Sequence, residues 1–388
     1  MRDFIITSLQ SWDIKIGSTI KNTALEISKQ HRVLYINTPP TYMDWVRYPF
    51  ARRKKGIVQI NENMWVAYLS SPIYPLNRIP WKWLFDKVNY ANNKKIAREI
   101  TDIARKLEFK DYIHLIDTDI YRSQYLKELL CPSLSVYYCR DYVIGEKYWR
   151  KNGTRLEPLI ATKADMVLAN SSLFADRFRQ YNPCTFVVNT GVDLSLYDAG
   201  KSHQPPTDIL PIPRPIIGYM GTLNSMRLDT EMLFGIACRM PQASFVFVGP
   251  WDAVFEKHPL RRLPNVHFLG KKAVSQLPAY IQAFDVCINP QTVNDMTYGN
   301  YPLKIDEYLA MGKPVVATST HTMQDVFRNH VFLPESPEEY MDALQQALLK
   351  AGDKAKAQER IAFAHTHSWE NSVKTIYESI ELTLKGKI

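Results

Sequence analysis

The stretch that most constrains the fold of this chain is residues 301–318, YPLKIDEYLAMGKPVVAT. Pro302 suits the first turn of a helix, where its missing N–H costs nothing, and Gly312 suits the left-handed position just past the end. Pro314 cannot continue a helix, and the apolar run 315–317 is typical of a strand covered on both faces. The stretch therefore predicts a short helix, a glycine stop and a buried strand, as in an α/β fold.

Two side chains of this predicted helix suit a nucleotide. The free N–H groups and the dipole of a helix N-terminus attract phosphate, and a bound phosphate would also attract Lys304 in the first turn. Glu307 lies three residues further on the same face and can accept hydrogen bonds from hydroxyls such as those of a ribose. The alternative is an amphipathic helix leading into a core strand, with both side chains solvated.

Residues 302–318 carry the pattern P-x-K-x-x-E-Y-x-A-x-G-x-P-V-V-A-T, which resembles the donor-binding helix of retaining GT-B glycosyltransferases of the group 1, or family 4, type. The resemblance is strong in the second half of the chain and loose in the first. It implies an α/β fold of two Rossmann-like domains facing a cleft, with a C-terminal helix that crosses back to the N-terminal domain. It also implies transfer of a sugar from a nucleotide diphosphate to a hydroxyl, with retention at the anomeric carbon.

Alternating strand-like and helical segments in both halves predict parallel sheets. Residues 199–215 are rich in proline and are interpreted as a semi-rigid linker. We therefore expect an N-terminal domain at 1–198, completed by a helix at 369–385, and a second domain at 216–368. The resemblance assigns the acceptor to the first domain and the nucleotide-sugar donor to the second.

Composition limits the cellular setting. The chain has 388 residues, enough for two domains, and its five cysteines contain no C-x-x-C pair, which argues against a disulfide framework and fits a reducing cytoplasm. The first residues are too short and too polar for a signal peptide, and no apolar run is long enough to span a bilayer. A cytoplasmic protein is expected.

The formal charge of +9 indicates an anionic partner. Aromatic and basic residues interleave at 45–55 and again at 81–85, a pattern that suits an anionic membrane surface. Peripheral association with the inner face of the plasma membrane is one interpretation. The other is a solvated basic loop followed by a helix whose tryptophans are core. Nucleic acid is not expected, because no nucleic-acid-binding motif occurs.

Candidate site residues of the first domain follow its predicted strands. In the loop after the first strand, Gly17 would allow close backbone approach to a donor diphosphate and Ser18 offers a cap oxygen, although a simple helix cap explains both equally well. The loops at 117–119 and 140–142 are candidates to face the acceptor, and Asp141 resembles one acid of the family's Y-D-x-x-D region. Glu157 resembles another family position, but a surface carboxylate is the alternative.

Candidate residues of the second domain would hold the donor. The resemblance points to Arg227 and Lys304 as the cations that neutralise the leaving diphosphate, with Glu307 and Asp141 completing the expected catalytic set. The expected donor-binding set comprises Gly17, Ser18, Gly221, Thr222, Gly249, Leu269, Gly270, Asn294, Asp295, Pro302 and Leu303. The donor would be of the UDP or GDP type, with no resident cofactor and no metal. The acceptor would be a glycan or a lipid-linked glycan.

One position departs from the family pattern. Many members carry a second glutamate eight positions before the one matched by Glu307, and this chain has Gly299 there. The preceding loop, with N-x-x-T at 294–297, resembles a subgroup associated with teichuronic acid and capsule synthesis. The role of the missing carboxylate could pass to Asp295, to Asn294 or to backbone amides.

Two other functions share this pattern. A nucleotide-sugar 2-epimerase would need acid–base groups including a histidine, and His114 lies in the middle of a predicted strand. A non-catalytic nucleotide-sugar-binding partner of another transferase would explain Gly299. An NAD or FAD enzyme is disfavoured, because no G-x-G-x-x-G follows the first strand of either domain.

Overall fold

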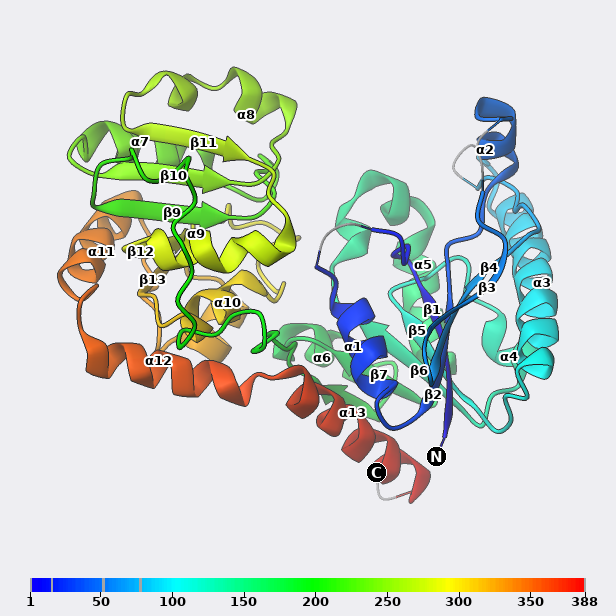
Figure 1. Ribbon diagram of the computed structural model, residues 1–388. Helices are drawn as coiled ribbons and strands as arrows, with labels where there is room; N and C mark the ends of the chain where they lie inside the picture. The colour runs from blue at the N-terminus through cyan, green and yellow to red at the C-terminus, as the bar shows by residue number, and fades with distance from the viewer. Residues whose placement is uncertain (1, 15–16, 51–52, 77–78, 387–388) are drawn as a thin grey trace. The chain divides into compact units, whose positions relative to one another are not determined.

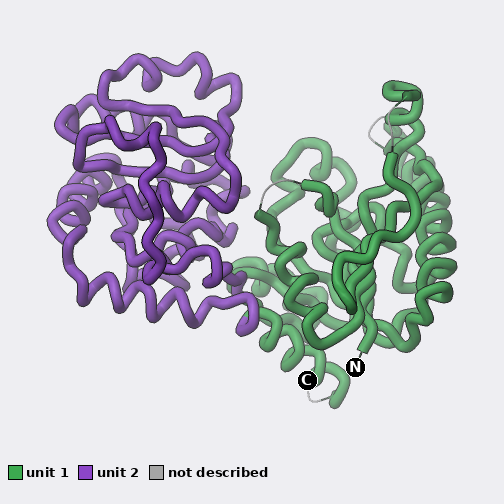
Figure 2. Tube along the Cα trace, viewed as in Figure 1, with its two compact units in different colours: residues 1–188, 372–388 green, residues 189–371 purple. Residues whose placement is uncertain are grey.

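The computed structural model describes residues 2–14, 17–50, 53–76 and 79–386. They divide into two units (Figure 2): unit 1 comprises residues 1–188 and 372–388, and unit 2 comprises residues 189–371. Each unit is built on one sheet, and parallel pairing predominates in both, as the alternating pattern predicted.

The sheet of unit 1 has the strand order β3-β4-β2-β1-β5-β6-β7-β8 (Figure 1). All neighbours pair in parallel except β3 and β4, which pair antiparallel at the edge. The strands are β1 (Asp3–Ser8), β2 (Arg32–Ile36), β3 (Gly56–Asn61), β4 (Met64–Tyr68), β5 (Ile113–Asp117), β6 (Leu134–Cys139), β7 (Met166–Ala169) and β8 (Thr185–Val187). The helical segments are α1 (Thr19–Ile27), α2 (Tyr42–Arg47), α3 (Lys82–Lys106), α4 (Leu126–Leu130), η1 (Val143–Gly145), α5 (Lys147–Lys163), α6 (Ser172–Arg179) and α13 (Trp369–Leu384).

Both faces of this sheet are covered, which explains the continuous apolar runs of its strands. Phe4 and Ile6 of β1 pack on one face with α1 and with Val373, Ile376 and Ile380 of α13. Ile5 packs on the other face with α3 and α4. Figure 1 shows α1 beside α13, and α3 beyond the strands from them. Unit 1 is therefore completed by residues from the far end of the sequence.

The sheet of unit 2 has the strand order β11-β10-β9-β12-β13, and all its pairs are parallel. The strands are β9 (Ile216–Met220), β10 (Ser244–Val248), β11 (Val266–Gly270), β12 (Val286–Asn289) and β13 (Val315–Ala317). The helices are α7 (Thr230–Arg239), α8 (Ala253–Lys257), α9 (Leu277–Ala283), α10 (Lys304–Ala310), α11 (Pro337–Leu349) and α12 (Lys354–Thr366), with short helical turns η2 (Pro259–Arg262), η3 (Val274–Gln276) and η4 (Met323–Phe327).

The predicted linker differs from the structure. Residues 189–215 all belong to unit 2, so the boundary lies ten residues earlier than the expected position at 198. Residues 199–215 form neither helix nor strand, but Ile209 and Ile212 are buried in the core of unit 2, together with Tyr197. The prolines concealed this packing, because the apolar side chains between them show no periodicity.

The helix, glycine stop and strand predicted at 301–318 are present as α10, Gly312 and β13. Gly312 has φ +70°. Its N–H donates to the carbonyl of Leu309 at 2.9 Å, and the N–H of Lys313 donates to the carbonyl of Tyr308 at 3.0 Å, which is the Schellman pairing. The helix begins at Lys304, so Pro302 lies just ahead of it rather than in its first turn.

Glu157 is not the surface carboxylate that one interpretation expected. Its side chain is fully buried in α5, where it accepts a hydrogen bond from the hydroxyl of Tyr137 at 2.9 Å and pairs with Arg177 of α6 at 2.5 Å. Burial raises the pKa of its carboxyl, and the Arg177 charge opposes that rise. The ion pair joins two helices that pack on the same region of the sheet.

Replacing Arg177 with methionine should destabilise the protein by about 3 kcal/mol, because it leaves a buried carboxylate without its partner while keeping the apolar stem. Chemical unfolding at neutral pH, followed by circular dichroism, measures the change. Arg179→Met is the matched control, since Arg179 pairs with Asp176 on an exposed surface of the same helix and should cost at most about 1 kcal/mol. Equal losses in the two variants would contradict the prediction.

None of the helices described combines the length and the apolar character that crossing a bilayer requires. Arg52, part of the basic aromatic stretch, lies outside the described residues.

Candidate functional site

Three glycines lie at the carboxyl edge of the sheet in unit 2. Gly221 and Gly249 follow β9 and β10, Gly270 ends β11, and their φ values are +138°, +150° and +74°. The N–H of Gly221 donates to the carbonyl of Val248, and the N–H of Gly249 donates to that of Gly270, both at 2.9 Å. A Cβ on Gly249 would stand 1.9 Å from the carbonyl oxygen of Gly221. At this edge, backbone therefore packs directly against backbone. The carboxyl edge is also the place where α/β sheets bind their ligands.

Lys304 faces this edge from the first position of α10. Its Nζ donates to the hydroxyl of Tyr219 at 2.8 Å and lies 4.4 Å from the centre of the same ring. A Cβ on Gly221 would stand 3.3 Å from that Nζ. The ammonium group forms no salt bridge with a carboxylate of any described residue, so its charge is available to an anion.

Glu307 lies one turn along α10 and is half-buried. The hydroxyl of Tyr197, a buried residue of the segment before β9, hydrogen-bonds to its carboxylate. Burial raises the pKa of the Glu307 carboxyl to about 7, although Tyr197 and the Lys304 charge act in the opposite direction. The carboxyl therefore changes charge near neutral pH.

A buried cluster behind these two residues was missed by sequence reasoning. Asp306 is fully buried; its Oδ2 accepts from the hydroxyl of Tyr301 at 2.8 Å, and its Oδ1 lies 2.8 Å from Nδ1 of His367. His367 is distant in sequence and follows α12, so no local pattern could have indicated it. The cluster fixes the rotation of α10 about its axis, which aims Lys304 and Glu307.

Asn294 and Asp295, the side chains predicted to substitute for the glutamate absent at position 299, lie in one loop with different surroundings. The Nδ2 of Asn294 donates to the carbonyl of Met226 at 2.9 Å, and its Oδ1 accepts from the N–H of Met296. Its amide therefore holds two loops together and is not free for a ligand. Asp295 is exposed and bonded to none of the described residues, while Gly299 is buried. Of the two side chains among the three predicted substitutes, that of Asp295 is the available one, and backbone amides stay the third possibility.

The other donor residues predicted in the second domain lie at the same edge of the unit 2 sheet. Arg227 is half-buried in the loop after β9, and its carbonyl accepts from the N–H of Thr292 at 3.0 Å. Thr222 is exposed, and Leu269 is partly buried at the end of β11. The carbonyls of Pro302 and Leu303 accept the first backbone bonds of α10. Across the described residues, no group of three His, Cys, Asp or Glu side chains has the arrangement of a metal site.

In unit 1 the predicted acids are mostly internal. Asp117 is fully buried at the end of β5, where it accepts from the hydroxyl of Ser8 at 2.6 Å and pairs with Arg140. Asp119 is also buried, and its carboxylate lies 2.9 Å from Nε of Arg122. Both acids are held in ion pairs at the sheet edge, so their carboxylates are engaged within unit 1, and the prediction that the 117–119 loop faces the acceptor stays a prediction.

The remaining unit 1 candidates are accounted for individually. Ser18 is buried and caps α1, and Gly17 beside it is exposed. Asp141 is half-buried in the turn after β6. His114 is fully buried in β5, within 3.0 Å of the Thr7 hydroxyl, and burial lowers its pKa to about 3. A substrate cannot reach it there, so His114 offers no acid–base group to an epimerase.

A cavity of about 450 Å³ opens at the carboxyl edge of the unit 1 sheet. Its lining includes Leu9 after β1, Tyr148 and Trp149 at the start of α5, and two arginines, Arg47 and Arg122. Aromatic faces and cations around a cavity of this size suit a sugar that carries an anionic group.

The basic aromatic stretch is partly helical. Residues 42–47 form α2, which has no buried residue, although a loop was one expectation. Val46 is 75% exposed and Phe50 is 97% exposed. Trp81 and Trp83, at the start of α3, are each 60% exposed, so the interpretation that they are core is wrong.

Comparison with known proteins finds a family match within the second half of the chain. Residues 214–350 match the family described as Glycosyl transferases group 1. The chain is also 32% identical, over 190 residues, to TuaH of Bacillus subtilis (strain 168), named as a teichuronic acid biosynthesis glycosyltransferase. That alignment covers 47% of each chain, so this chain matches about half the length of that curated relative.

Solved structures resemble the whole chain. Sucrose-phosphate synthase from Thermosynechococcus elongatus has a TM-score of 0.73 at 17% identity, with 100% of both chains covered. Anabaena HepE in complex with UDP-glucose has a TM-score of 0.68 at 17% identity, covering 98% of this chain and 100% of that one. At such identities the likeness shows the fold alone. It confirms the expected GT-B fold, with one α/β sheet in each unit.

Proposed function

We propose that this chain, whose residues 214–350 form a group 1 glycosyltransferase domain, transfers a sugar from a nucleotide diphosphate to a hydroxyl group. The transfer retains the anomeric configuration, and the acceptor is a glycan or a lipid-linked glycan of a cell-surface polysaccharide. The name of TuaH, a relative over half the chain, supports that setting. No resident cofactor takes part, because the nucleotide sugar itself is the substrate.

The observation that carries the proposal is the position of Lys304. Departure of the sugar leaves a diphosphate whose growing negative charge needs fixed positive partners. The ammonium of Lys304 stands beside Gly221, held by Tyr219 and paired with no carboxylate among the residues described. Arg227, in the loop after β9, is the second cation. The neutralisation of the diphosphate is assigned to these two side chains and not to the N-terminus of α10, because that helix has only seven residues.

The nucleoside is held at the same edge. Glu307 accepts hydrogen bonds from the ribose hydroxyls, and the backbone at Leu269 and Gly270 meets the base. The binding of UDP and UDP-glucose by HepE, which has the same fold, favours a UDP-type donor. Asp295 takes the place of the carboxylate that Gly299 lacks.

The acceptor binds unit 1. The cavity lined by Tyr148, Trp149 and Arg47 offers rings on which a sugar stacks and, in Arg47, a cation for an anionic substituent. The exposed apolar side chains of α2 and of Trp81 and Trp83 bring the protein to an anionic membrane, where a lipid-linked acceptor resides. Association of this kind is peripheral.

Thermal unfolding in the presence of UDP, GDP, ADP, CMP, dTDP and their sugars tests the proposal. A ligand that binds only the native state raises the apparent stability by mass action. One nucleoside diphosphate is expected to stabilise the protein, and its sugar to be hydrolysed slowly or transferred. A folded protein that none of them stabilises would contradict the proposal. Stabilisation with neither hydrolysis nor transfer would favour a non-catalytic binding partner.

Affinity for the nucleotide sugar should fall as the pH is lowered from 8 to 6. The raised pKa of Glu307, about 7, means that its carboxylate becomes protonated over this window and accepts ribose hydrogen bonds less well. Below the pKa the affinity should decline by up to roughly tenfold per pH unit. Calorimetry with the nucleotide sugar measures this, because its diphosphate is a diester and stays ionised throughout.

Glu307→Gln is the matched control. The amide keeps the shape of the side chain but cannot titrate, so this variant should bind more weakly at pH 8 and show a flat profile. A wild-type profile as flat as that of the variant would disprove a direct role of the carboxylate.

A further inference from the structure

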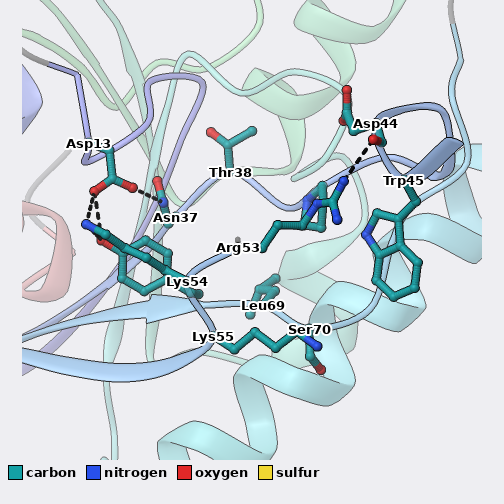
Figure 3. A pocket seen from close by; sticks show the side chains of 12 residues that line it. Asp13, Asn37, Thr38, Asp44, Trp45, Arg53, Lys54, Lys55, Leu69 and Ser70 are labelled. Atoms are coloured by element: carbon teal, nitrogen blue, oxygen red, sulfur yellow. Dashed lines mark hydrogen bonds and ion pairs between the residues drawn. The ribbon is translucent and has the colours of Figure 1, made fainter. Parts of the chain in front are cut away.

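A second cavity of unit 1 lies outside the proposed transfer site. It measures about 400 Å³ and lies between the loop after β1, the segment 37–45 and the segment that leads into β3. Figure 3 shows Arg53, Lys54 and Lys55 among its lining side chains, with Asp44 and Trp45 of α2 at one end and Asp13 at the other. Three consecutive cationic side chains therefore line one cavity.

Both carboxylates of this cavity accept hydrogen bonds from other groups of the protein. Asp13 is bonded to Nζ of Lys54 at 2.7 Å, to the hydroxyl of Tyr68 at 3.0 Å and to Nδ2 of Asn37 at 3.1 Å. Asp44 accepts from the N–H and the hydroxyl of Thr41 in the capping box of α2. Asp13 thus already has a cationic partner, Lys54, while the carboxylate of Asp44 is held by the N-terminal cap of α2.

Two of the three cations form no ion pair with a carboxylate among the described residues. Nη2 of Arg53 donates to the carbonyls of Asp44 and Tyr48, both at 2.8 Å, so this guanidinium holds the end of α2 without meeting a carboxylate among the described residues. Lys55 is exposed and forms no hydrogen bond or salt bridge with any residue the structure describes, and no dashed line reaches it in Figure 3. The cavity is thus a preformed site for an anion.

Exposed apolar side chains follow Trp45, a lining residue of the cavity, in the sequence, and the carbonyl of one of them, Tyr48, accepts from the lining residue Arg53. Val46, Tyr48 and Phe50 are 75%, 57% and 97% exposed. Placing such side chains in water is unfavourable, whereas the interface of a bilayer accommodates rings and apolar chains beside cations. Unpaired cations in a cavity, next in sequence to exposed apolar groups, suit a lipid that carries phosphate in its headgroup.

We propose that this cavity binds the phosphodiester headgroup of an anionic membrane phospholipid, with Lys55 and Arg53 on the phosphate and Trp45 as a wall. Val46, Tyr48 and Phe50 then enter the acyl boundary of the same leaflet. The proposal extends the peripheral membrane association proposed above. It adds a stoichiometric lipid site to what would otherwise be attraction by surface charge alone.

Calorimetry with a soluble short-chain phosphatidylglycerol, below its micelle concentration, tests the site. The wild type should bind one lipid per chain, and Lys55→Glu should weaken binding at least about tenfold, since it reverses a charge at the phosphate. Short-chain phosphatidylcholine should bind more weakly, because its choline meets Arg53 and Lys55. Glycerol phosphate should also bind more weakly, because it lacks the acyl contact.

Lys82→Glu is the matched control. Lys82 is an exposed cation between Trp81 and Trp83 and lines neither cavity of unit 1 described above, so its reversal should weaken binding to vesicles of phosphatidylcholine with phosphatidylglycerol but leave monomeric lipid binding unchanged. Equal monomer binding by wild type and Lys55→Glu, no monomer binding at all, or glycerol phosphate binding as tightly as the lipid would each overturn the proposal. Stabilisation of each variant by the nucleoside diphosphate, measured in parallel, reports separately on the proposed transferase.

Discussion

Replacing Gly249 with alanine will unfold unit 2. The new Cβ would stand 1.9 Å from the carbonyl oxygen of Gly221, and the backbone has a φ of +150° that side-chain-bearing residues rarely adopt. Neither backbone segment can move aside easily, because the N–H of Gly221 is hydrogen-bonded to Val248 and that of Gly249 to Gly270, each on an adjacent strand. We expect a loss of roughly 4 kcal/mol or more, with most of the protein recovered unfolded or aggregated.

Gly235→Ala provides the comparison. Gly235 lies inside α7, and a Cβ there would meet nothing within 4 Å, so the substitution should stabilise the protein by about 1 kcal/mol. Thermal unfolding of the two variants beside the wild type measures both effects. A Gly249→Ala protein that melts like the wild type would show that the sheet edge can move aside.

Replacing Lys304 with methionine should remove most of the affinity for the nucleoside diphosphate. The variant keeps the length of the side chain and its packing on Tyr219 but loses the charge that faces Gly221. A charged hydrogen bond of this kind corresponds to a loss of roughly a hundredfold in affinity. The rate of sugar transfer should fall at least as far, because the diphosphate gains charge as the sugar departs.

Calorimetry with the diphosphate identified in the thermal screen checks this, and Lys257→Met serves as control. Lys257 ends α8 and is exposed, so its loss removes one positive charge from the same unit without touching the sheet edge. Unchanged affinity in Lys304→Met, in a protein with native stability, would exclude Lys304 as the phosphate partner. A similar loss in both variants would indicate a non-specific charge effect.

Local signals made α10 and β13 predictable. Gly312 can adopt a positive φ without strain, Pro314 prevents the helix from continuing, and the buried run 315–317 has the apolar character of a two-sided strand. Each of these is a property of a residue and its immediate neighbours. The alternation of strands and helices in unit 1 was predictable for the same reason.

Contacts between distant residues were not predictable. Asp306 meets His367, Glu307 meets Tyr197, and Glu157 meets Arg177, and in each pair the partner comes from another segment of the fold. No spacing rule marks such a partner in a single sequence. The exposure of α2 was also hidden, because its apolar residues resemble those of a helix that packs on a core.

The discontinuity of unit 1 has a consequence for the order in which the chain folds during synthesis. Residues 189–371 are continuous and can complete unit 2 as soon as they leave the ribosome. The core of unit 1, by contrast, lacks Val373, Ile376 and Ile380 until those residues have also been synthesised. Throughout the translation of unit 2, one apolar face beside Phe4 and Ile6 remains uncovered. Unit 1 therefore completes its core only after unit 2 has been synthesised, although most of its residues precede those of unit 2.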